Sequence, residues 1–109
     1  MALPLNVFKT VTYVAPTSPV GIYTAPVGYS GVVLLAQVAN IDSVSHSVSL
    51  SHQRTVTTTE IVKDFPIEGK DTLSLINGRL ILESGDSLQL SGSNDSNLKL
   101  TVSILETLN

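Results

Sequence analysis

The stretch from residue 44 to residue 52, VSHSVSLSH, decides the fold class because its side chains alternate without a break. Valine, histidine and leucine occupy the even positions, and serine occupies every odd position between them. A period of two is that of a β-strand, whose successive side chains point to opposite faces. We therefore predict a strand that turns Val48 and Leu50 toward a core and its serines toward water.

Two further segments extend this pattern. The C-terminal stretch 98–104 places its apolar residues on every second position (Leu98, Leu100, Val102 and Ile104) and predicts a second half-buried strand. The segment 31–40 is apolar on both faces, with Val32, Leu34, Ala36 and Val38 against Val33, Leu35 and Ala39. Such a strand is covered on two sides, so it lies in the middle of a sheet or has its outer face in a subunit contact.

Shorter strands are predicted between the turn-forming residues of the chain. They cover 7–14, 22–25, 57–64 and 87–90, and Phe65-Pro66 is expected to end the third. A hairpin is predicted over 73–82, because Asn77-Gly78 favours a type I′ turn. The next residues, 83–86, are predicted to form a turn. About eight short strands without an amphipathic helix predict an all-β fold, a single antiparallel β-sandwich of jelly-roll type. We assign residues 1–109 to one domain, with residues 1–6 as an N-terminal arm.

Composition limits what this domain does. With 42% hydrophobic and 14% charged residues the chain is too apolar to be disordered. The net charge is −3 and the six basic residues are scattered, so we expect no nucleic-acid binding. Cysteine is absent, so extra stability is expected from oligomerisation instead of disulfides. No apolar run approaches the ~20 residues of a membrane span, and the N-terminus lacks the pattern of a signal peptide. We expect neither membrane association nor export.

The sequence offers little for catalysis. His46 and His52 face the same side of one strand but lie roughly 20 Å apart at ~3.3 Å per residue, too far to share a metal ion in a monomer. We interpret them as strand-end histidines with ordinary polar contacts. The many serines lack a Gly-x-Ser-x-Gly elbow, which argues against a nucleophilic triad.

Acidic and amide side chains gather at the predicted turns. The stretch 91–97 resembles a calcium loop only remotely, and local turn formation is the favoured interpretation. Five of the acidic residues fall near predicted strand ends and turns (Asp64, Glu68, Asp71, Glu83 and Asp86). We interpret Glu83 and Asp86 as turn formers. Carbohydrate sites, including those of glycosidases, normally contain aromatic side chains that stack on the sugar. The chain has five aromatic residues and no Trp, which disfavours such a site. We expect no catalytic, cofactor-binding or metal-binding residues and no cofactor, with sugar binding as a minor alternative.

Three tyrosines flank the proline-rich segment 16–26. Tyr13, Tyr23 and Tyr29 either pack at the end of the sandwich with their hydroxyl groups in water, or act as interface anchors. The sequence favours neither alternative.

Two motifs carry a resemblance to a known group. The segment 22–28, IYTAPVG, opens the apolar strand that ends in Val38-Ala39-Asn40, and 78–88, GRLILESGDSL, precedes the final alternating strand. This arrangement resembles small virion proteins of tailed bacteriophages, particularly marine phages and cyanophages, and it covers most of residues 20–106.

The resemblance implies a β-sandwich present in many copies on a virion and transfers no catalytic residues. It implies a non-enzymatic structural protein, most readily a capsid decoration or cement protein, with a neck or tail component as the alternative. The expected partners are further copies of the chain in a homo-oligomer and other virion proteins, such as the major capsid protein. The expected location is the virion, assembled in the host cytoplasm.

Overall fold

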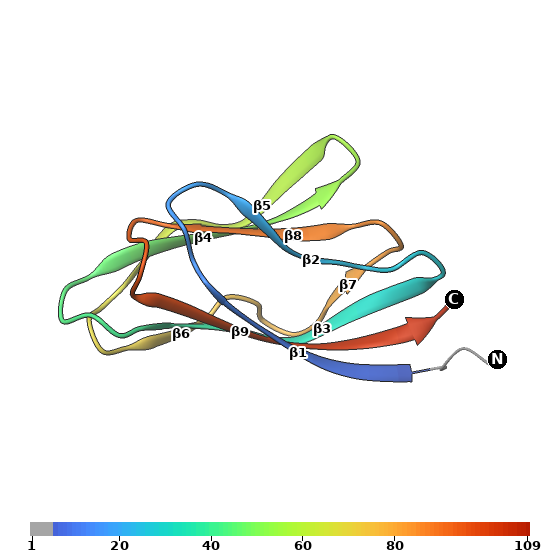
Figure 1. The fold of residues 1–109 in the computed structure, drawn as a ribbon, viewed down its shortest axis with the longest axis horizontal. Helices are drawn as coiled ribbons and strands as arrows, with labels where there is room; N and C mark the ends of the chain where they lie inside the picture. The colour runs from blue at the N-terminus through green and yellow to red at the C-terminus, as the bar shows by residue number, and fades with distance from the viewer. Residues whose placement is uncertain (1–5) are drawn as a thin grey trace.

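The computed structural model describes residues 6–109, which form nine strands in two stacked antiparallel sheets (Figure 1). The strands are β1 (Asn6–Val14), β2 (Val20–Thr24), β3 (Tyr29–Asn40), β4 (His46–Arg54), β5 (Thr57–Ile67), β6 (Thr72–Ser74), β7 (Leu80–Leu82), β8 (Ser87–Gly92) and β9 (Leu98–Leu108). Sheet A has the order β1-β9-β3-β6, with β7 also paired to β3, and sheet B has the order β2-β8-β4-β5. The predicted all-β sandwich is confirmed.

The pairing follows the jelly-roll pattern. Strands β6 and β7 both pair antiparallel to β3 and together act as one interrupted strand. The chain then contains eight strands in which the first pairs with the last, the second with the seventh, the third with the sixth and the fourth with the fifth. This is a long antiparallel ribbon folded over into two sheets, the architecture named jelly roll.

The core lies between the sheets and is supplied by the alternating strands. In β4, Val48 and Leu50 are fully buried, while the serines on either side of each are only partly buried. In β9, Leu98, Leu100, Val102 and Ile104 are likewise buried. The two strands recognised first in the sequence therefore line the interior from opposite sheets, as predicted from their period of two.

Strand β3 changes its inward face halfway along. Val33 is buried before a register shift against β9, and Ala36 and Val38 are buried after it. Leu34 and Leu35, at the shift, are both exposed by more than a third. Neither set of alternating residues predicted for this strand forms a single face, because the β-bulge adds one residue and moves the inward positions from odd to even numbers.

Three details of the prediction were wrong, and a fourth lies mostly outside the described residues. The segment 73–82 is not a hairpin, since β6 and β7 pair with β3 instead of each other, and among Asn77 and Gly78 only Gly78 has a positive φ. Strand β5 runs through Pro66, which an edge strand tolerates. Val44 lies in a loop and is 56% exposed. Of the proposed arm, residues 1–5 lie outside the described residues, and Asn6 is paired with Thr107 in β1 and β9.

Among the described residues, no helix is long and apolar enough to cross a membrane.

Candidate assembly surface and polar clusters

The outer face of sheet A carries a row of apolar side chains across its full width. Residues that stand directly opposite each other in a sheet lie on the same face. Phe8 of β1 stands opposite Leu105 of β9, Leu105 stands opposite Val32 of β3, and Val32 stands opposite Ile81 of β7. Phe8 is 75% exposed and Ile81 59% exposed, so both ends of the row project into solvent.

The same face is almost free of charge. Its remaining strand positions are Thr, Ser, Asn, Gln, Ala and Val, together with the exposed Leu34 and Leu35 of the bulge. Lys99 is the one charged residue among its described strand positions, and it lies at the end of β9 away from the apolar row. Such a face can pack against another protein without desolvating charged groups, which are depleted from the centres of protein interfaces. We define this surface as the sheet A face.

The outer side of sheet B has a different character. Its central strands present serine and glutamine, and a cleft of about 180 Å³ opens beside β5. The lining of this cleft includes Ser51, Thr58, Glu60, Lys63 and Gln89. Seven of its ten lining residues carry hydroxyl, amide or charged side chains, so it offers hydrogen-bonding groups to a polar ligand.

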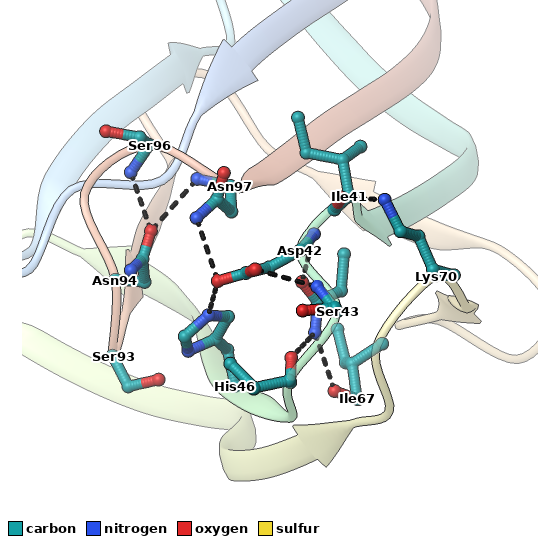
Figure 2. Close-up of polar contacts among 12 residues, drawn as sticks. Ile41, Asp42, Ser43, His46, Ile67, Lys70, Ser93, Asn94, Ser96 and Asn97 are labelled. Carbon is teal, nitrogen blue, oxygen red and sulfur yellow. Dashed lines mark hydrogen bonds and ion pairs between the residues drawn. The ribbon is translucent and has the colours of Figure 1, made fainter.

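A polar cluster closes one end of the sandwich, where three loops meet (Figure 2). His46, the first residue of β4, contacts Asp42 Oδ2 through its Nε2 at 2.9 Å, and the Asn97 amide donates to the same oxygen at 3.1 Å. A carboxylate only accepts hydrogen bonds, so Nε2 of His46 carries the proton. The hydrogen bond from His46, followed by one from the Ser43 backbone, lowers the pKa of Asp42 below its ordinary value.

Asn40 anchors this end from inside. It is 1% exposed, and its amide nitrogen donates to the carbonyl oxygens of Val44 and Ile67, both at 2.9 Å. Its side-chain oxygen accepts from the Asp42 backbone at 3.1 Å. One buried side chain therefore ties the β3–β4 loop to the end of β5 with all its polar atoms bonded, as burial requires.

A second, charged cluster closes the opposite end. Asp86 is 2% exposed, and both of its oxygens are bonded to Arg54, by Nε at 2.9 Å and by Nη2 at 2.7 Å. His52 Nε2 and the Glu83 backbone nitrogen add contacts at 3.0 Å each. The Arg54 hydrogen bonds are the largest cause of a strongly lowered pKa of Asp86, against the opposing effect of burial.

The two histidines are therefore held at separate ends of β4, each by an aspartate. This agrees with their interpretation as strand-end histidines with ordinary polar contacts. The His52–Asp86 pair has the geometry of a base and its orienting acid. In the described part of the chain, however, no hydrogen bond joins His52 to a serine or threonine oxygen.

The tyrosines have different environments. The Tyr23 hydroxyl donates to Glu106 Oε2 at 2.6 Å, and Lys9 Nζ lies 3.1 Å from Glu106 Oε1. Burial first, and then the Glu106 carboxylate, raise the pKa of Tyr23 well above its ordinary range. Gly31 leaves room for the ring, since a Cβ there would lie 3.0 Å from the Tyr23 hydroxyl. Tyr23 is thus a packing residue with a bonded hydroxyl, and Tyr13, on the β1 edge, is 40% exposed.

In the loop 91–97, side-chain oxygen atoms accept hydrogen bonds from backbone nitrogens. Asn94 Oδ1 accepts from the backbone nitrogens of Ser96 and Asn97, and Asp95 Oδ1 accepts from the Thr17 nitrogen. The Asn94 contacts agree with the favoured interpretation as local turn formation, whereas the Asp95 contact joins this loop to a residue 78 positions away. The described residues contain no group of three or more His, Cys, Asp or Glu residues placed to hold a metal ion.

Of the acidic residues singled out in the sequence, only Glu83 and Asp86 are brought together. Asp64 bonds Ser49 on sheet B, Asp71 accepts from Thr72 at its own turn, and Glu83 and Asp86 meet at Arg54.

The Arg54–Asp86 pair was not predicted from the sequence. A signal was present, because His52 and Arg54 are two residues apart and therefore extend from one face of β4.

No protein-family model matches this chain, and no curated protein matches its sequence. Among solved structures, it is similar to a chain in the crystal structure of the T13 IBDV viral particle, with a TM-score of 0.55 and 10% sequence identity. The similarity covers 97% of the present chain and 32% of the viral chain, so this chain spans about a third of that protein's length. At this identity the likeness is one of fold alone.

Proposed function

We propose that this chain is a non-enzymatic structural protein of a bacteriophage virion, bound in many copies to the capsid as a decoration or cement protein. The observation that carries the proposal is the sheet A face, which presents an apolar row and a single lysine among its described strand positions. A face of this kind buries apolar area against a protein lattice at little electrostatic cost.

Two further observations support a virion role. Jelly rolls are common in viral capsid and lectin domains, and the fold is similar to part of a chain in a viral particle. The sequence also resembles small virion proteins of tailed phages. The major capsid protein is the proposed partner, further copies of this chain complete the assembly, and the virion, assembled in the host cytoplasm, is the proposed location.

Co-sedimentation with capsids of the parent phage that lack this protein tests the proposal. The wild-type protein is expected to pellet with capsids and to saturate at a stoichiometry set by the lattice. Ile81→Lys, which adds a charge at an exposed position in the apolar row, is expected to weaken binding at least tenfold. Ser51→Lys, on the outer side of sheet B, is the matched control and is expected to bind as the wild type does. Equal binding by both variants would place the contact elsewhere, and no binding by the wild type would reject the capsid role.

A neck or tail position is the alternative within the same class. Antibody labelling of intact virions separates the two, because a decoration protein is labelled over the whole capsid and a neck or tail component only at one vertex or along the tail.

A carbohydrate-binding module is the second candidate function, and the polar cleft beside β5 is the observation that favours it. Glycan-array binding that is lost in Glu60→Ala and kept in Ile81→Lys would support this function. No binding to any glycan would count against it.

A further inference from the structure

The four sheet edges of this sandwich differ in how they are protected from pairing with another strand. In sheet B, β2 has five residues and a bulge, and β5 contains Pro66 and two register shifts. In sheet A, β6 and β7 are three-residue segments separated by a loop. These are recognised devices for blunting an edge.

Strand β1, the remaining edge, lacks all of these devices. It has nine residues, all paired with β9 in one unbroken register, and it contains neither Pro nor Gly. Figure 1 shows it as the outermost ribbon of its sheet, beside β9. A long, regular edge of this kind is a template for a further strand.

The backbone groups that β1 offers can be identified. Directly after β1, the Ala15 nitrogen donates to the Leu98 carbonyl oxygen at 2.9 Å. In an antiparallel pair, residues alternate between hydrogen-bonded and non-hydrogen-bonded positions, so the odd-numbered residues of β1 bond to β9. The even-numbered residues, Asn6 to Val14, therefore turn their N–H and C=O groups toward the open edge.

We propose that β1 pairs antiparallel with β1 of a second copy, about a two-fold axis that passes beside Thr10. This register places Thr10 opposite its own copy and Phe8 opposite Thr12 of the second copy. It brings even-numbered residues opposite each other along the whole strand, so up to about ten backbone hydrogen bonds form. A two-fold axis beside any other residue of β1 would leave part of the open edge without a partner strand.

The side chains of β1 favour a second copy as the occupant. Its one charged residue, Lys9, stands opposite Val11 in this register, so no like charges meet, and Lys9 is already paired with Glu106. A shallow hollow of about 520 Å³ lies over the end of β1, lined by Thr12, Tyr13, Val14, Lys99, Leu100 and Thr101. Phe8 projects 75% exposed at the other end of the strand, and the two-fold axis brings it opposite Thr12, at the hollow of the second copy. One edge thus provides both the projection and the depression that receives it, as an isologous contact requires.

The two sheet A faces would then join into one surface of twice the width. Because the contact involves one strand on each side, it falls below the roughly 1,200 Å² of a standard interface, and a dissociation constant on the order of micromolar is expected. The pairing does not depend on the proposed function.

Sedimentation velocity over a wide concentration range is the first test, and the expected result is a shift from 11.5 kDa to twice that mass. The chain has no cysteine, so single cysteines report the register. Thr10→Cys places two thiols on residues about 5.5 Å apart, within disulfide range, and is expected to give a covalent dimer on mild oxidation. Thr12→Cys is the matched control, because its copies lie about four residues, or roughly 13 Å, apart along the strand.

Charge variants make the test independent of oxidation. Thr10→Lys and Thr10→Glu are each expected to weaken the dimer at least tenfold, and an equimolar mixture is expected to dimerise again. Circular dichroism confirms that each variant is folded. A wild-type protein that stays monomeric at all concentrations, or a Thr12→Cys variant that cross-links as readily as Thr10→Cys, would overturn the pairing. A monomer that still binds capsids would overturn the pairing alone and leave the proposed function standing.

Discussion

The two ends of the sandwich are closed by different physical means, although β4 begins at one and ends at the other. At its start, His46 and Asn97 hold a partly exposed Asp42, and the buried Asn40 joins the loops with neutral hydrogen bonds. At its end, Arg54 holds the buried carboxylate of Asp86. We refer to these as the amide end and the charged end.

The difference predicts where stability depends most on pH, because the carboxylate with a lowered pKa at the amide end, Asp42, is partly exposed and Asp86 is buried. A buried amide keeps its hydrogen bonds at any ordinary pH, whereas a buried carboxylate keeps its ion pair only while it is ionised. The charged end also depends on one partner, because Arg54 supplies two of the four contacts to Asp86. The amide end spreads its contacts over three loops, as Figure 2 shows. The predictions below separate these two modes of closure.

The largest effect is expected for Asp86→Ala. The substitution leaves Arg54 and the Glu83 backbone nitrogen without their acceptor, and it should lower the free energy of unfolding by about 3 kcal/mol at pH 7. Urea denaturation measures the loss. Glu83→Ala is the matched control, because Glu83 contacts the same guanidinium at 3.1 Å but is 70% exposed at its side chain. Its loss should stay under about 1 kcal/mol.

The same variant tests the pH dependence. The pKa of Asp86 is lower in the folded protein than its ordinary value of about 3.9, so this group contributes stability above that pH. The contribution is lost as the pH falls below about 4 toward the folded-state pKa. The wild-type protein should therefore lose stability more steeply than Asp86→Ala over this acid range. Parallel curves for the two proteins would contradict the assignment of acid sensitivity to the charged end.

At the amide end, Asn40→Ala should cost about 2 kcal/mol, because it removes the donor to two carbonyl groups at a buried position. This loss should be the same at about pH 2 and at pH 7, whereas the loss in Asp86→Ala should shrink as the pH falls below about 4. Asp42→Ala, at the exposed side of the same cluster, is the control and should cost less than Asn40→Ala. A larger loss for Asp42→Ala would mean that the surface contacts with His46 and Asn97 hold this end together.

The sequence predicted β4 and β9 because their alternation is strict and their partners in the sheet do not alter it. It did not predict the bulge of β3. Leu34 and Leu35 are both apolar, so the pattern fits odd-numbered and even-numbered inward positions equally well. The hairpin over 73–82 failed for a different reason. Asn77-Gly78 is a local turn signal, and pairing with β3, which is distant in sequence, prevailed over it.

The polar clusters were harder to predict than the strands. His46 and Asp42 are four residues apart and their contact is local, but Arg54 and Asp86 are separated by 32 positions. Only the jelly-roll pairing brings the β4–β5 turn beside the turn at 83–86. The function of Asp86 as a buried anchor therefore follows from topology, whereas its place at a turn follows from the sequence.

The smallest effect concerns the turn that follows Arg54 at the charged end. Thr55 is the first of two residues that connect β4 to β5, and it has a φ of 55°. A β-branched side chain is strained in this conformation, and turns with positive φ at this position favour Gly. Thr55→Gly should raise stability by about 0.5–1 kcal/mol, the relief of strain less the entropy cost of Gly. The thermal midpoint measures this gain, and Val56→Gly, at a position without positive φ, should lower it. A loss in Thr55→Gly would show that the threonine itself supports the turn that presents Arg54 to Asp86.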